Sequence, residues 1–170
     1  ALNNNKGSFN LAVGHNSMEE NTFGEYNTAF GYLSLNKNTT ANNSVAIGFQ
    51  ALYSQTGNST DNDLNNTAIG YEALYTNDPS SSTDGRFNVA VGHQSGYSNT
   101  TGYANTFLGY QSGYSNLTGS NNVFIGYKAG YYETNSNKLY IENSNSSSPL
   151  IYGDFSTDDI IINGNLELDY

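Results

Sequence analysis

A glycine recurs through this sequence in the motif Asn, any residue, small residue, large apolar residue, Gly, aromatic residue, and its spacing limits the folds open to the chain. Successive glycines are 17, 17, 22, 22, 17 and 17 residues apart. A period this regular, broken only by two equal insertions of 5 residues, predicts a solenoid in which each repeat forms one coil and the insertions bulge as loops. The repeated glycines are Gly14, Gly31, Gly48, Gly70, Gly92, Gly109 and Gly126.

The residues in front of each glycine alternate in character as a β-strand requires. The residue directly before the glycine is always large and apolar, as in Ile47, and the residue three before it is mostly β-branched, as in Val45 and Thr67. A period of two residues predicts a strand and excludes a helix here. We expect the large apolar residue to face the core and the Ala or Phe between the two positions to face a close neighbour. A second short strand is expected to begin after the glycine.

Together these patterns predict an all-β protein, a parallel β-roll or solenoid of seven coils of about 17 residues, two of them extended by 5 residues. We expect the roll over residues 1–134 and a β-rich connector or cap over residues 135–170. A column this slim encloses a thin core, which does not offset the cost of ordering the chain, about 1–2 kcal/mol per residue for the backbone alone. We therefore expect a homotrimer in which the row of small residues forms the subunit interface.

Composition excludes several classes of function. Charged residues make up 12% of the chain and the formal net charge is −10, so repulsion argues against nucleic acid as a partner. No apolar run approaches the roughly 18 residues of a membrane span, so we expect no membrane insertion of this segment. Cysteine is absent, and no nucleophile, base and orienting acid share a suitable spacing. We interpret the chain as a non-enzyme without catalytic residues, cofactor or metal.

An asparagine stands four residues before the repeat glycine in every repeat except one, where Ser44 replaces it. Stacked identical amides can hydrogen-bond along the axis of a solenoid, so this row predicts a structural ladder rather than a ligand site. His15 and His93 directly follow a repeat glycine where other repeats have Tyr or Phe, and they are interpreted as members of an aromatic row. The asparagines are Asn10, Asn27, Asn66, Asn88, Asn105 and Asn122.

A tyrosine recurs five residues after the repeat glycine in the last five repeats. Equivalent aromatic residues on adjacent coils should lie about 4.8 Å apart, which suits offset stacking. Exposed rings could also bind the faces of sugar rings, and a stack within the protein and a glycan-binding strip can coexist. This candidate strip consists of Tyr53, Tyr75, Tyr97, Tyr114 and Tyr131.

The two insertions are the predicted site of binding specificity, because polar residues on loops held by a rigid scaffold commonly carry binding function. They fall on consecutive coils, around residues 56–64 and 77–86, and should protrude side by side. A trimer would present them three times and gain avidity from weak single contacts. The candidate receptor-binding residues are Asp61, Asp63, Asp78, Asp84 and Arg86.

The segment Asn43-Ser44-Val45-Ala46-Ile47-Gly48 resembles the repeat signature of the head domain of trimeric autotransporter adhesins, and Asn66-Thr67-Ala68-Ile69-Gly70 is a near copy of it. The resemblance extends over roughly residues 10–131 and implies a left-handed parallel β-roll trimer that displays a surface for attachment. The segment that follows, with Asn137-Lys138-Leu139-Tyr140-Ile141 and Pro149-Leu150-Ile151-Tyr152-Gly153, resembles the connector of phage tail-fibre-like surface proteins.

These patterns and the resemblance predict a structural and adhesive segment of a trimeric extracellular fibre, on a cell surface or on a virion or tail fibre. Its expected partner, besides two further copies of the chain, is a cell-surface or matrix component, with a glycan as one candidate. An inert rigid spacer in a phage-tail or injection-system fibre is the alternative. An ice-binding solenoid is disfavoured, because threonine stands three before the glycine only in alternate repeats, at Thr28, Thr67 and Thr106, and is expected to face inward.

Overall fold

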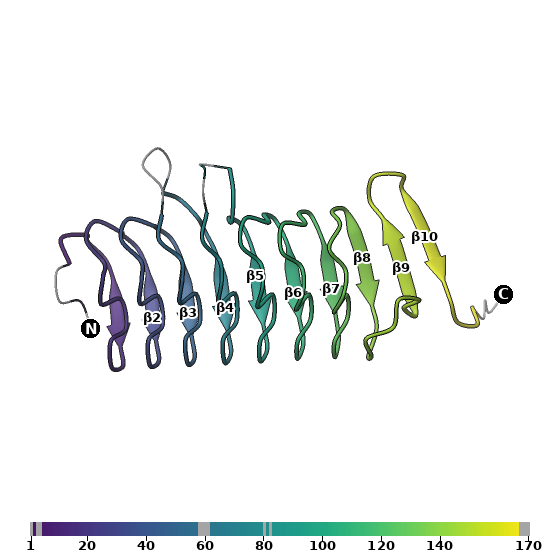
Figure 1. Ribbon diagram of the computed structural model, residues 1–170, viewed down its shortest axis with the longest axis horizontal. Coiled ribbons are helices and arrows are strands. Elements are labelled where there is room, and N and C mark those ends of the chain that lie inside the picture. The colour runs from purple at the N-terminus through teal and green to yellow at the C-terminus, as the bar shows by residue number, and fades with distance from the viewer. Residues whose placement is uncertain (1, 3–4, 58–61, 80, 82, 167–170) are drawn as a thin grey trace.

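The computed structural model describes residues 2, 5–57, 62–79, 81 and 83–166. Within these residues the chain forms no helix, and ten strands make one sheet whose spatial order follows the sequence (Figure 1). The strands are β1 (Leu11–Val13), β2 (Thr28–Phe30), β3 (Val45–Ile47), β4 (Thr67–Ile69), β5 (Val89–Val91), β6 (Thr106–Leu108), β7 (Val123–Ile125), β8 (Lys138–Ile141), β9 (Ile151–Asp154) and β10 (Asp159–Ile162).

The first eight strands pair in parallel, and equivalent residues of successive repeats lie side by side. Ala29 pairs with Ala46, and Ala46 pairs with Ala68 although the chain between them is 5 residues longer. The insertions therefore leave the register unchanged, as a solenoid with bulging loops requires. The expected all-β solenoid is confirmed, and in Figure 1 it forms an elongated stack of about seven coils.

The orientation of the strand residues is the reverse of what we expected. The middle residue of each strand points into the coil, and Ala46, Ala68 and Phe107 are fully buried. The large apolar residue before the glycine points outward instead, and Phe30 is 55% and Ile47 37% exposed. The coil is narrow. Where a large side chain such as Leu52 enters from the opposite wall of the coil, the inward-facing residue of the strand must be small, as Ala46 is. The row of small residues therefore lies inside a single chain and is not available as a subunit interface.

The segment after each repeat glycine forms a turn, and the expected second strand is wrong. Two residues of this turn adopt left-handed backbone conformations, such as Leu33 with φ 55° and Leu35 with φ 47°. Left-handed residues reverse the chain within a few positions and break the extended geometry of a strand. Outside the ten strands, the described residues form one isolated β-bridge, between Asn42 and Asp63.

The repeat glycines form a column in which no side chain can be accommodated. Gly31 has φ 143°, and a Cβ atom on it would lie 2.3 Å from the carbonyl oxygen of Gly48. The backbones of successive coils therefore approach each other too closely at this corner for any other residue. This close approach explains why the glycine is the invariant element of the repeat.

The interior is filled by two columns of side chains whose sizes compensate. In the early coils the buried middle residue is Ala, and the residue four after the glycine is large, as in Leu52 and Leu74. Phe107 and Phe124 replace Ala in later coils, whereas glycine already replaces Leu at Gly96, one coil earlier, because the Phe107 ring packs against Gly96 as well as Gly113. A Cβ atom on Gly113 would lie 2.4 Å from the Phe107 ring, so the ring occupies the volume that a larger neighbour would need.

The sheet continues without interruption from the coils into the connector. Strand β8 adds one more parallel rung, with Leu139 paired to Val123. The chain then reverses, and β9 and β10 extend the sheet as antiparallel strands. Strand β10 lies at the end of the stack, and its residues Ile160, Ile161 and Ile162 are 67%, 51% and 41% exposed.

Candidate functional site

The asparagine ladder expected from the sequence is present. The side-chain oxygen of Asn88 accepts a hydrogen bond from the backbone N–H of Asn105 at 3.0 Å, and the Asn105 oxygen accepts one from the N–H of Asn122 at 3.0 Å. The Nδ2 group of Asn105 donates to the carbonyl oxygen of Gly119 at 2.8 Å. Each buried amide thus joins two coils and closes its own coil, which leaves it committed to the scaffold.

A second buried amide ladder, which we did not predict, is formed by the residues seven positions after the repeat glycines. In this ladder Asn38 Nδ2 donates to Asn21 Oδ1 at 2.8 Å. The signal was visible as a recurring amide in six repeats, ending at Glu133 in the seventh. The buried members are Asn21, Asn38, Gln55, Asn77, Asn99 and Asn116.

The tyrosines of the candidate strip stack on one another. Successive rings have centroids 5.0–5.2 Å apart and planes within 4–6° of parallel. Burial in the stack raises the pKa of both Tyr75 and Tyr97. The next cause is the neighbouring Tyr53 for Tyr75 and the charge of Glu72 for Tyr97. The predicted stacking is confirmed, whereas glycan binding by the strip stays a prediction. Because neighbouring rings cover each other, a sugar ring could stack on this ladder only at its ends.

A second aromatic ladder runs parallel to the first and is formed by the residues directly after the repeat glycines. His15 and His93 belong to it as expected: His93 stacks between Tyr71 and Tyr110, with centroids 4.8 and 5.1 Å away. Side chains two after the glycine link successive coils beside this ladder. Gln94 donates to Glu72, for example, at 2.8 Å. Lys128 lies 5.4 Å from the ring centroids of both Tyr127 and Tyr131, so it bridges the two ladders at their C-terminal end.

The two insertions lie on adjacent coils and contact each other, since Thr56 Oγ1 donates to Asp78 Oδ1 at 2.7 Å. Asp63 is also engaged within the protein, because its Oδ1 accepts hydrogen bonds from Asn42 and Asn43, both at 3.0 Å. The guanidinium of Arg86 lies 4.8 Å from the centroid of the Phe87 ring.

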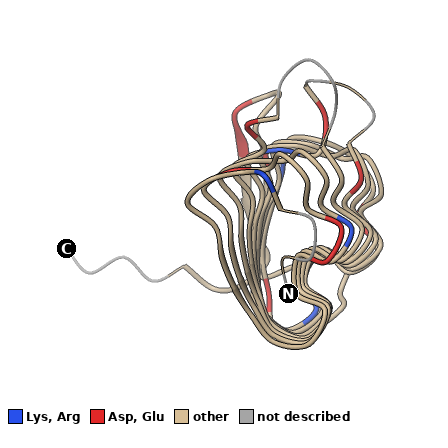
Figure 2. Ribbon diagram, turned by 90° about the vertical axis from the view of Figure 1, so that its left-hand side faces the viewer, with Lys and Arg blue, Asp and Glu red and all other residues tan. Residues whose placement is uncertain are grey.

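Among the other candidate loop residues, Asp84 is half-buried and Asp61 lies outside the described residues. Viewed along the rod in Figure 2, the coils superpose and the charged residues occupy a few places on their outline. A role of the loops in binding stays a prediction.

The outer face of the sheet carries an unbroken row of large apolar residues. Directly paired residues share one face of a sheet, so the register places one such residue on each of the ten strands, through the parallel and the antiparallel parts alike. Thr28, Thr67 and Thr106 lie on this outer face too, which corrects the expected inward orientation. The row consists of Val13, Phe30, Ile47, Ile69, Val91, Leu108, Ile125, Ile141, Ile151 and Ile162.

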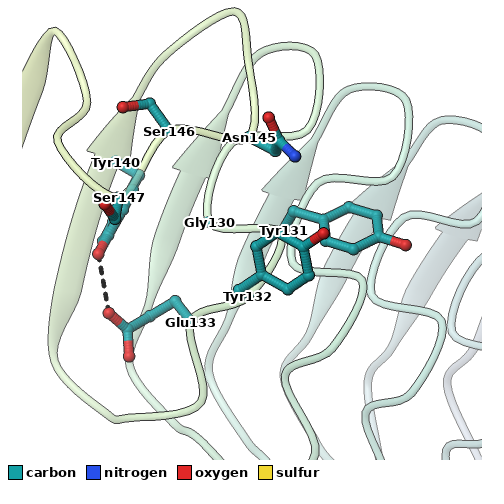
Figure 3. Close-up of a pocket in the computed structure, with 8 residues that line it drawn as sticks. All are labelled: Gly130, Tyr131, Tyr132, Glu133, Tyr140, Asn145, Ser146 and Ser147. Carbon is teal, nitrogen blue, oxygen red and sulfur yellow. Dashed lines mark hydrogen bonds between the residues drawn. The ribbon is translucent and has the colours of Figure 1, made fainter.

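A small cavity of about 150 Å³ lies where the tyrosine ladder ends and the connector begins. Figure 3 shows the rings of Tyr131 and Tyr132 on one side of it, Ser147 and Tyr140 on the opposite side, Asn145 and Ser146 above, and Glu133 below. Tyr132 is 68% exposed and meets Tyr131 edge-on, with centroids 4.7 Å apart and planes at 73°. This cavity could not be predicted from the repeat pattern, because segment 145–147 reaches it only through the turn after β8.

Glu133 is held in place by three hydrogen bonds. Its Oε1 accepts from the backbone N–H and from Nδ2 of Asn135, both at 2.8 Å, and its Oε2 accepts from the Tyr140 hydroxyl at 2.9 Å. Burial alone would raise the pKa of Glu133, but these donors outweigh it and lower the pKa below its ordinary value. Burial and the Glu133 carboxylate also raise the pKa of Tyr140. The cavity therefore contains an ionised carboxylate beside a neutral phenol.

Metal ions and membranes are two other kinds of partner to consider for the described residues. No three His, Cys, Asp or Glu side chains gather there in a group that could hold a metal ion. The described ranges also contain no helix that is long and apolar enough to cross a membrane. In comparisons with known proteins, no protein family, curated protein or solved structure matches the chain.

Proposed function

We propose that this chain is a structural and adhesive segment of a homotrimeric extracellular fibre. The observation that carries the proposal is the apolar row on the outer face of the sheet, which runs along ten consecutive strands. Leu108 is 45% and Val13 42% exposed in the single chain. A continuous apolar face of this length marks a surface that another protein covers.

Further copies of the same chain are the partner that fits this face. The row repeats once per strand, and a parallel copy carries the same row at the same spacing, so apolar residues meet apolar residues along the full length. Cyclic symmetry lets slim columns bury such a face around a common axis, and three copies also shield Ile160 and Ile162 of β10, which the register places on this face. The resemblance of the repeats to adhesin heads supports three copies and an outward surface for attachment.

The native mass in solution tests the assembly. One chain has a mass of 18.4 kDa, and we expect the purified protein to have three times that mass. Ile69→Glu places a charge in the middle of the apolar row and should shift the protein to a single chain or to an unfolded one. Thr118→Glu, on an exposed loop residue away from the sheet, is the matched control and should stay trimeric. A folded single chain at all concentrations would refute the trimer.

Attachment is tested separately with the intact protein. We expect the trimer to bind cells or a glycan array, and a variant that shortens both extended coils to 17 residues to lose the binding that the loops provide. The unchanged register across both insertions indicates that this variant keeps its fold. Full binding by the shortened variant would move the site away from the loops.

The alternative of an inert spacer is favoured by the hydrogen bonds that the polar side chains of the scaffold make with one another. Most buried amide groups of the two ladders are hydrogen-bonded within the chain, and Asp63 and Asp78 accept hydrogen bonds from neighbouring coils. Asn77 Nδ2 and Asn99 Oδ1 are the buried side-chain atoms of the described residues that make no hydrogen bond. A spacer would bind neither cells nor glycans. Its removal from a longer fibre would therefore leave host binding by the fibre tip unchanged. Ice binding is less well supported, because the outward threonines alternate with valine and lie beside large apolar residues. A measurement of thermal hysteresis tests it.

A further inference from the structure

The cavity beside Glu133 lies where the sequence stops repeating. Six residues after the glycine the four preceding coils have serine or threonine, and this coil has Tyr132. Seven residues after the glycine the preceding coils have a neutral amide, and this coil has Glu133. A ladder needs identical residues, whereas a binding site needs distinct ones. Two adjacent departures from the repeat that line one cavity therefore indicate a site.

Tyr132 is the tyrosine at this end whose ring faces are open. In the ladder, Tyr97 and Tyr114 have each face covered by a parallel neighbour. At the opposite end of the ladder, Lys37 lies over the Tyr53 ring with Nζ 5.7 Å from its centroid. Tyr132 touches Tyr131 only through an edge-on contact and is 68% exposed. It presents a flat apolar surface at the rim of the cavity.

Polar groups around the cavity complement this ring. Within the described part of the chain, the Asn145 amide and the Ser147 and Tyr132 hydroxyls make no hydrogen bond, so they are free to donate and accept. Glu133 is the opposite case, because three donors fix its orientation. A carboxylate offers about four acceptor positions, so Glu133 keeps capacity for one more hydroxyl donor.

We propose that this cavity binds one ring of a neutral saccharide, with its C–H face on Tyr132 and its hydroxyl groups on Glu133, Asn145 and Ser147. A volume of about 150 Å³ is small beside the roughly 300–1,000 Å³ of pockets that enclose drug-sized ligands, so it suits a single small ring. The ionised Glu133 and the net charge of −10 repel sialic and uronic acids, which restricts the ligand to uncharged sugars. The proposal rests on the attachment function and names the chemistry of one contact that would serve it.

Ligand-observed NMR on the full chain tests the site. The probes are methyl glycosides of neutral hexoses and N-acetylhexosamines, with sialic acid and a hexuronic acid for comparison. We expect binding of at least one neutral glycoside and none of the acids. Tyr132→Ala should weaken that binding at least about tenfold, the factor expected for the loss of a stacking contact. Glu133→Gln should weaken it severalfold and allow the acids to bind, which a merely structural role would not produce.

The matched control is Tyr103→Ala, which removes another exposed tyrosine away from this cavity and should leave saccharide binding unchanged. Thermal unfolding of each variant checks that the fold is retained. The proposal is overturned if no neutral glycoside binds, if the acids bind as well as the neutral sugars, or if Tyr132→Ala binds like the unmodified chain. The same protein is assayed on cells in parallel. Cell attachment without saccharide binding would reject this site alone, and absence of both would also reject the attachment function.

Discussion

Gln55 Nε2 donates a hydrogen bond to Ser44 Oγ at 3.0 Å, and this contact repairs the one break in the first amide ladder. Ser44 is too short to reach the next coil. Gln55, one methylene longer than the asparagines of its own ladder, bridges the gap and accepts a hydrogen bond from Asn66 Nδ2 at 2.9 Å. The two exceptions to the repeat, one in each ladder, are therefore a single compensated pair.

This pair should behave non-additively. Gln55→Asn removes the two hydrogen bonds that Gln55 makes with Ser44 Oγ and Asn66 Nδ2, and it should cost about 1–3 kcal/mol of unfolding free energy. Ser44→Asn forces a larger side chain against Gln55 and should cost a similar amount. The double variant recreates a regular coil and should lie within about 0.5 kcal/mol of the unmodified chain. Urea unfolding of all four proteins provides the measurement, and a double variant as unstable as the two losses combined would contradict the pairing.

The compensation between Phe107 and Gly113 gives a second prediction. Phe107→Ala should cost about 3–5 kcal/mol, because it leaves a cavity where the ring was. Gly113→Leu alone should be poorly folded, since its Cβ atom would lie 2.4 Å from that ring. Together the two changes reproduce the pairing of the early coils, where Leu35 and Leu52 have φ 47° and 50°. Thermal unfolding should show the double variant recovering more than half of the loss.

Recovery in that double variant requires leucine to adopt the left-handed backbone conformation of Gly113, which has φ 63°. Leu35 and Leu52 adopt similar conformations in the early coils. Gly113→Ala in the Phe107→Ala background serves as the control, because it tests the backbone conformation without filling the cavity. A double variant no more stable than Phe107→Ala alone would mean that the two columns do not exchange volume.

The periodicity of the glycine was enough to predict the solenoid, its register and the position of every strand through β7. The sequence did not reveal which face of each strand points inward, since Ala46 and Ile47 are both apolar and only the narrowness of the coil decides between them. A large Phe107 occurs with a small Gly113, and a small Ala46 occurs with a large Leu52. This opposite variation in size could have indicated that these residues face each other inside the coil. The cavity depends on Asn145 and Ser147, whose position follows from the chain reversal after β8 rather than from any repeat.

The tyrosine ladder and the exposed Tyr132 should differ sharply in their effect on stability. Tyr97→Ala removes two stacked contacts, with Tyr75 and Tyr114, and should cost about 1–3 kcal/mol. Tyr132→Ala removes one edge-on contact of a largely exposed ring and should change the free energy of unfolding by no more than about 0.5 kcal/mol. Chemical unfolding followed by circular dichroism compares the two. Equal losses would show that stacking in the ladder contributes little.

The final prediction concerns acid and the antiparallel end of the sheet. Lys138 Nζ pairs with Asp154 Oδ2 across β8 and β9, and this contact, helped by hydrogen bonds from Ser156, lowers the pKa of Asp154 from 3.8 to about 2. A carboxyl whose folded-state pKa lies below its unfolded value stabilises the fold above the unfolded pKa and loses that contribution as pH falls through the folded one. The junction between β8 and β9 should therefore loosen between about pH 4 and about pH 2, before the parallel coils do.

Amide exchange measured by NMR, corrected for intrinsic rates, reports this loosening directly. The N–H of Phe155, which donates to Asn137 at 2.8 Å, should lose protection over this range, whereas the N–H of Val45, bonded to Asn66 at 2.8 Å, should not. Asp154→Asn abolishes the titrating group and should leave the protection of Phe155 lower at neutral pH but unchanged by acid. An acid response that persists in this variant would assign the sensitivity to another carboxyl, with Glu133 the next to examine because its pKa is lowered as well.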